Sequence, residues 1–110
     1  MRLNPLDPRI AAMRAAAAHA LFFLGRYDEA ASLAAMALQD YPDYQPGLRI
    51  AAASNAMAGR PEQAHKAVDR LRQPNPPLRV STLKDVVGPY RRAEDLSRFE
   101  EGLRQAGLPA

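Results

Sequence analysis

The turn and cap residues of this 110-residue sequence recur with a spacing of 34 residues. The matching pairs are Gly25 with Gly59, Arg26 with Arg60, Ala30 with Ala64 and Pro42 with Pro76. Self-similarity at a fixed period of this length is typical of proteins built from stacked repeating units. The register therefore predicts two copies of one supersecondary unit, and it makes a fold without internal repeats hard to reconcile with the sequence.

Each unit is predicted to be a pair of helices joined by a short turn. We expect helices over residues 9–24, 28–40, 46–58 and 61–72. Gly25 and Gly59 follow the first helix of each pair, where glycine commonly ends a helix in a left-handed conformation. Because the connections are short, each pair must fold back on itself as an antiparallel hairpin.

Alanine accounts for 22 of the residues, and tryptophan is absent. Alanine has the highest helix propensity and little volume, so we expect an almost entirely helical chain whose helix backbones lie close together. The hydrophobic share of 47% and the charged share of 25% are typical of a globular protein. The absence of cysteine excludes a disulfide framework, a thiolate metal site and a cysteine nucleophile.

The net charge of +3 is spread along the chain, and 13 of the 15 basic residues are arginines. Scattered charges of this kind usually form a solvated surface. No uncharged apolar run reaches the roughly 18 residues that a membrane-spanning helix needs. Residues 10–24 resemble a signal peptide, but Arg14 and His19 interrupt that run, so we interpret it as the first helix and expect a cytoplasmic protein.

These features resemble the tetratricopeptide repeat (TPR) family. The residues that carry the resemblance are Gly25, Tyr27, Ala30, Ala37, Pro42, Ala52, Gly59, Ala64 and Pro76. Arg14 and Leu48 depart from the large aromatic residue of the family's first helix, and Pro61 replaces the usual turn tyrosine. The resemblance implies an all-α fold: a right-handed superhelix of antiparallel helix pairs, a TPR-like α-solenoid of about six helices.

The resemblance divides the chain, residues 1–110, as a single TPR-like domain. Repeat 1 covers residues 9–42 and repeat 2 covers residues 43–76, while residues 79–107 form a degenerate helix pair. Within this last segment we expect a short helix over 82–87 and an amphipathic helix over 93–106, with Leu96, Phe99 and Leu103 on one side. A solenoid needs an atypical terminal unit, so we expect this pair to cap the stack.

The C-terminal stretches 90–96 and 101–109, and the opening stretch 2–8, look like parts of bacterial proteins that place an adenylate-cyclase domain ahead of TPR units. This resemblance implies that the chain is the C-terminal part of a larger bacterial protein. No motif of the cyclase itself occurs here. It leaves open a regulatory or self-association domain of a bacterial adenylate or guanylate cyclase as the alternative function.

No group of residues in the sequence predicts catalysis. His19 and His65 are far apart and have no cysteine or aspartate at a metal-ligand spacing. The adjacent carboxylates of Asp28 and Glu29 point to different sides of a helix, where a first-turn charge simply favours the helix dipole. Each glycine stands alone, so there is no phosphate-binding loop. We therefore expect no enzyme, no cofactor and no metal site.

The TPR register instead predicts a concave groove lined by the first helix of each pair, which would bind a peptide or a partner helix. The predicted groove residues are Ala12, Ala15, His19, Phe22, Phe23, Arg49, Ala53, Ala56 and Met57. Ordinary packing between helices is the competing interpretation for Phe22 and Phe23. Ala15, His19 and Ile50 occupy positions where chaperone-binding members of the family hold a carboxylate clamp, so we do not expect chaperone binding.

Two further surfaces follow from the sequence. Two repeats are few, so the side of the first helix around Ile10, Met13 and Ala17 should be exposed, to be covered by an upstream repeat or by a second copy in a homodimer. A nucleic-acid site is the remaining alternative. It would use Arg70, Arg72, Arg79, Arg91 and Arg92, and we do not expect it because these arginines lack interleaved aromatic residues.

Overall fold

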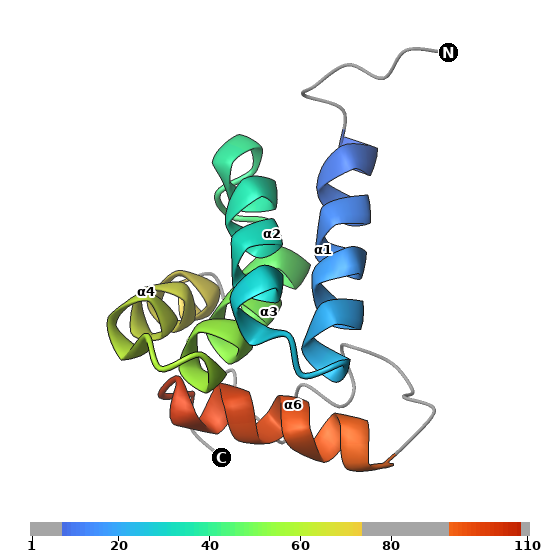
Figure 1. Cartoon of the computed structure of the whole chain (residues 1–110). Coiled ribbons are helices and arrows are strands. Elements are labelled where there is room, and N and C mark those ends of the chain that lie inside the picture. Colours follow the sequence, from blue (N-terminus) through green and yellow to red (C-terminus); the bar gives the residue numbers. More distant parts are fainter. Residues whose placement is uncertain (1–7, 74–92, 109–110) are drawn as a thin grey trace.

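The computed structural model describes residues 8–73 and 93–108, and every regular element within them is an α-helix (Figure 1). The helices are α1 (Pro8–Phe23), α2 (Tyr27–Asp40), α3 (Gln45–Met57), α4 (Pro61–Arg72) and α6 (Ala93–Gln105). The predicted all-α class is therefore confirmed. The first four helices agree with the predicted ranges to within one residue at each end.

The turns between α1 and α2 and between α3 and α4 have the same geometry. Gly25 and Gly59 each have a φ of +81°, a conformation that costs other residues energy. The amide of Arg26 donates to the carbonyl oxygen of Leu21 at 2.9 Å, and the amide of Arg60 donates to that of Asn55 at 2.8 Å. This bond spans the last helical turn in both hairpins and satisfies a carbonyl that the helix end would leave unpaired.

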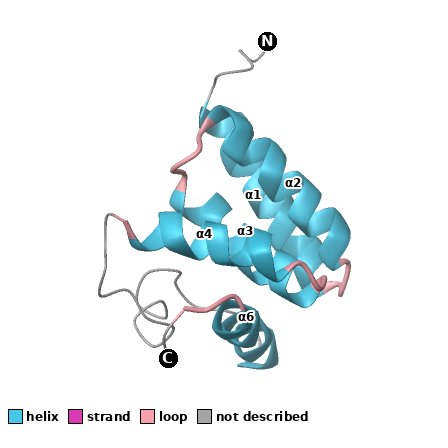
Figure 2. Cartoon of the chain, turned by 90° about the vertical axis from the view of Figure 1, so that its left-hand side faces the viewer, coloured by secondary structure: helices cyan, strands magenta, loops and turns pink. Residues whose placement is uncertain are grey.

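The four helices form two antiparallel hairpins, α1 with α2 and α3 with α4, and α3 packs against both helices of the first hairpin (Figures 1 and 2). The closest approaches are lined by alanine. Ala18, Ala30, Ala52 and Ala64 are completely buried, and they are the small residues at corresponding positions of the two repeats. Small side chains let helix backbones approach closely, so this core gains contact from backbone proximity and not from large side chains.

An ion pair joins the two turns. The guanidinium of Arg60, in the second turn, lies 2.5 Å from the carboxylate of Asp28, at the beginning of α2. Both side chains are partly exposed, so the pair adds little stability. It does show that the second hairpin is placed directly beside the first.

Helix α6 lies across α3 and reaches the C-terminal end of α1 (Figures 1 and 2). The predicted amphipathic helix 93–106 is therefore present, and Phe99 and Leu103 are buried as expected. The expected helix at 82–87 lies outside the described residues, as do Pro76, Arg79, Arg91 and Arg92. The described residues contain five helices, and the sixth expected helix is not among them.

Candidate functional site: the inner face of α1 and α3

The nine predicted groove residues lie on the sides of α1 and α3 that we call the inner face. Ala15, Phe22 and Ala53 are buried, and only Ala12 is exposed. The remaining members are half-buried: His19, Phe23, Arg49, Ala56 and Met57. Part of this face packs within the hairpins, and α6 covers another part. The structure thus brings the predicted residues together but does not leave them as an open groove.

Phe99 of α6 inserts between two rings of α1. Its ring centroid lies 5.5 Å from that of His19 and 5.8 Å from that of Phe22, and the second pair is nearly perpendicular. Edge-to-face contacts at such distances are favourable beyond the area that they bury. Phe22 also makes an edge contact with Tyr27, with a centroid separation of 5.1 Å, so one aromatic cluster joins α1, α2 and α6.

The close approach of α6 to α3 depends on Gly102. A Cβ atom placed on Gly102 would lie 3.0 Å from the Cβ of Ala53 and 3.1 Å from its carbonyl oxygen. Any larger side chain would push against the backbone of α3, which cannot yield cheaply. A helix that carries glycine at this position can therefore lie directly on α3, and a helix without it cannot.

Polar and apolar contacts fix the two ends of α6. The guanidinium of Arg98 donates to the carbonyl oxygen of Phe23 at 2.9 Å, so a cation satisfies the C-terminal end of α1. At the other end Leu103, Ala106 and Leu108 are buried in the same core as α3. The contact between α6 and the inner face therefore combines an aromatic anchor, a backbone approach and a helix-end hydrogen bond.

His19 is the one residue of the inner face whose protonation is perturbed. Burial lowers its pKa, a hydrogen bond to the carbonyl oxygen of Ala15 raises it, and the positive charge of Arg49 lowers it further, in decreasing order of effect. The Nδ1 atom lies 2.8 Å from that carbonyl oxygen and donates to it. The net shift is downward, which favours the neutral ring against Phe99 at neutral pH.

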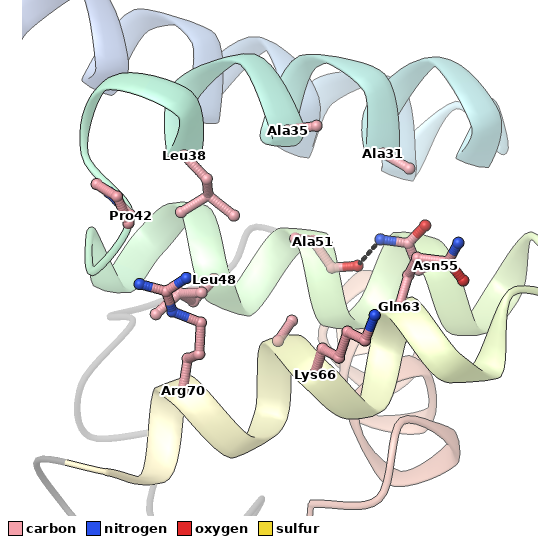
Figure 3. A pocket seen from close by; sticks show the side chains of 11 residues that line it. Ala31, Ala35, Leu38, Pro42, Leu48, Ala51, Asn55, Gln63, Lys66 and Arg70 are labelled. Atoms are coloured by element: carbon pink, nitrogen blue, oxygen red, sulfur yellow. Dashed lines mark hydrogen bonds between the residues drawn. The ribbon is translucent and has the colours of Figure 1, made fainter.

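A second hollow lies on the opposite side of α3, between α2 and α4 (Figure 3). It has a volume of about 230 Å³ and is lined by Ala31, Ala35, Leu38, Pro42, Leu48, Ala51, Asn55, Gln63, Lys66, Ala67 and Arg70. The amide of Asn55 donates to the carbonyl oxygen of Ala51 at 2.9 Å, so this polar side chain is satisfied within α3. Sequence reasoning missed this hollow, although the small residues of α2 at a helical spacing were a signal for it.

The residues described by the structure contain no group of three or more histidine, cysteine or acidic side chains that could hold a metal ion. No helix in that part of the chain has the length and apolar character needed to cross a membrane. Of the arginines proposed for a nucleic-acid site, Arg70 forms an ion pair with Asp43 at 3.1 Å.

Comparisons of the chain with protein-family models, with curated proteins and with solved structures found no match. No family membership is therefore assigned to the chain. Its function has to be argued from its own geometry, of which the contact between α6 and the inner face is the most specific part.

Proposed function

We propose that the chain is a non-catalytic protein-interaction module, a TPR-like solenoid whose inner face binds a helix of a protein partner. The observation that supports the proposal is the seat of α6. A helix distant in sequence already lies on this face, held by Phe99 against α1 and by Gly102 against α3. Helix-in-groove recognition uses anchors at such spacings on one side of an amphipathic helix.

The contacts of α6 define the chemistry of the proposed partner. The partner helix carries an aromatic residue that stacks on His19, a glycine or alanine one turn later that faces Ala53, and an aliphatic residue beyond it. It also carries a cation at the position of Arg98, which bonds the end of α1. A partner with a large side chain opposite Ala53 is excluded by the spacing at that point.

The same observation implies competition. A partner helix and α6 cannot occupy the inner face together, because both would fill the space beside Ala53. A helix tethered within the chain has an effective concentration in the millimolar range, so a partner has to bind more tightly than α6 or find α6 released. The module would thus be closed by its own last described helix until a better ligand replaces it.

The test uses a labelled peptide of residues 93–108 as the ligand. We expect weak binding to the unaltered chain and binding at least about tenfold tighter to Gly102→Leu, in which α6 is pushed off the face and no longer competes. Gln105→Leu is the matched control, because it adds the same side chain to the exposed side of α6. Fluorescence anisotropy measures both affinities.

If the peptide binds neither variant, while circular dichroism shows that Gly102→Leu keeps its helices, the proposal is wrong. The same conclusion follows if Gln105→Leu tightens binding as much as Gly102→Leu does. A labelled peptide in which the residue at 102 is leucine should bind neither protein.

The alternative function, a self-association or regulatory domain attached to a bacterial adenylate or guanylate cyclase, is favoured on one point. The side of α1 that faces away from α3 is apolar and exposed, and it includes Met13 and Ala17 from the predicted surface. Ile10 is only half-buried. This observation bears on self-association, whereas the cyclase connection rests on the resemblance of the terminal stretches alone.

A further inference from the structure

The side of α1 that faces away from α3 carries an apolar stripe along most of the helix. Its exposed members are Ala12, Met13, Ala16, Ala17, Ala20 and Leu24. Met13 is 63% exposed and Leu24 is 71% exposed, and they are the two most exposed large hydrophobic side chains among the described residues. From Ala12 to Leu24 the stripe is about 18 Å long and contains no charge.

The second repeat shows how such a stripe is normally used. The residues 34 positions later in α3 are Gly47, Ile50, Ala51 and Ser54, the counterparts of Met13, Ala16, Ala17 and Ala20, and all four are buried. They are buried because the first hairpin packs on this side of α3. The stripe on α1 has the same position and the same small side chains, so it has the properties of a surface that a helix covers.

Helix α2 extends the exposed surface beside the stripe. Met36 is 42% exposed and lies 34 residues before Arg70, which stands on the side of α4 that borders the hollow toward α2. By the same register, Met36 stands on the side of α2 that points away from the second hairpin. The stripe and Met36 together form what we call the end face of the first hairpin.

The opposite end of the stack is polar. Ala31, Ala35 and Leu38 of α2 border the hollow toward α4. Their counterparts on α4, 34 residues later, are His65, Asp69 and Arg72. A second copy that stacked its end face on α4 would bury these polar groups, which is costly. Head-to-tail growth is therefore unfavourable, and the remaining way for two copies to cover the stripe is to pair it with itself.

We propose that two copies of this chain associate through their end faces, with α1 packed antiparallel against α1 of the second copy about a twofold axis. An interface of this kind is self-complementary, and two uncharged alanine-rich stripes can approach closely without repulsion. One helix and its flank bury less than the roughly 800 Å² per partner of a standard interface. The dimer is therefore reversible, with a dissociation constant in the micromolar range.

Sedimentation equilibrium of the whole chain, from about 5 µM to about 1 mM, measures this association. We expect Ala17→Glu, at the middle of the stripe, to weaken dimerisation at least about tenfold, because it places two like charges against each other. Gln63→Glu is the matched control, since it adds the same charge to an exposed position of α4, and it should leave the dimer unchanged.

The absence of cysteine from the sequence allows a second test of geometry. In Ala17→Cys, the two thiols meet near the twofold axis, so mild oxidation should give a disulfide-linked dimer. Gln63→Cys should not form one under the same conditions. A chain that stays monomeric at every concentration overturns the proposal. So does a dimer that survives Ala17→Glu while Ala17→Cys fails to cross-link, because that dimer would use another surface.

Discussion

Helices α1 and α3 are the corresponding elements of two repeats, yet they experience different surroundings. Helix α3 is covered on three sides by α1 and α2, by α4 and by α6, and seven of its residues are buried. Helix α1 is buried only along the line of Ala11, Ala15, Ala18 and Phe22. Both helices consist of small apolar residues with few charges.

The difference shows that local sequence determines the helix, while its position in the stack determines which sides are buried. A helix that is apolar on all sides is expected in an interior. Helix α3 has that interior position, and α1 has the composition without the covering. The comparison therefore separates what each residue contributes to the hairpin from what it contributes to contacts between hairpins.

Ala17 and Ala51 break the comparison most strongly, because they are the same residue in the same register. Ala51→Glu should lower the free energy of unfolding by about 3 kcal/mol or more, since it buries a charge between α2 and α4. Ala17→Glu should change the stability of the monomer by less than about 0.5 kcal/mol, because its side chain is exposed. Urea unfolding of both variants at low protein concentration measures the two effects, and equal losses would contradict the comparison.

Ser54 and Ala20 sharpen it with a smaller effect of the opposite sign. The hydroxyl of Ser54 is buried and has no hydrogen-bond partner among the described residues. Ser54→Ala should therefore raise the free energy of unfolding by about 1 kcal/mol, because an unsatisfied buried group is removed. Ala20→Ser, at the exposed counterpart, should be nearly neutral. Thermal unfolding tests the pair, and a loss of stability in Ser54→Ala would show that the hydroxyl does have a partner.

The smallest effect concerns pH, at the one edge of α1 that α6 covers. The folded pKa of His19 lies below its unfolded value of 6.5, so the unfolded chain binds this proton more readily. The contribution of His19 is therefore fully present above about pH 6.5 and is lost as the pH falls toward the folded pKa. Unfolding between about pH 7.5 and about pH 5 should show a smaller pH dependence in His19→Phe than in the unaltered chain. Substitution of the exposed His65 by glutamine should leave the dependence as it was.

Much of the fold could be predicted from the sequence, because turn chemistry and spacing are local. Gly25 and Gly59 mark the ends of α1 and α3 through the conformation that the turn requires, and the structure gives both the same φ. The small residues at Ala30 and Ala64 are buried as the register indicates. The amphipathic pattern of residues 93–106 also predicted correctly that Phe99 faces the interior.

The place where α6 docks could not be predicted in this way. Amphipathicity tells which side of a helix is buried, but it does not tell what that side packs against. Gly102 lowers helix propensity when viewed locally, and its role appears only beside Ala53, which lies 49 positions earlier in the chain. The predicted groove was therefore defined by residues that do lie together, while the helix that covers them was assigned to the end of the stack.

The distance in sequence between α6 and its seat also affects the order in which the chain acquires structure. The two hairpins are formed by neighbouring segments, whereas the bond from Arg98 to Phe23 joins residues 75 positions apart. Contacts between near neighbours form early and distant contacts form late. During synthesis on the ribosome, both hairpins can therefore assemble before α6 has been made. In that interval His19 and Phe22 are uncovered, and a helix from another newly made chain could take the place of α6.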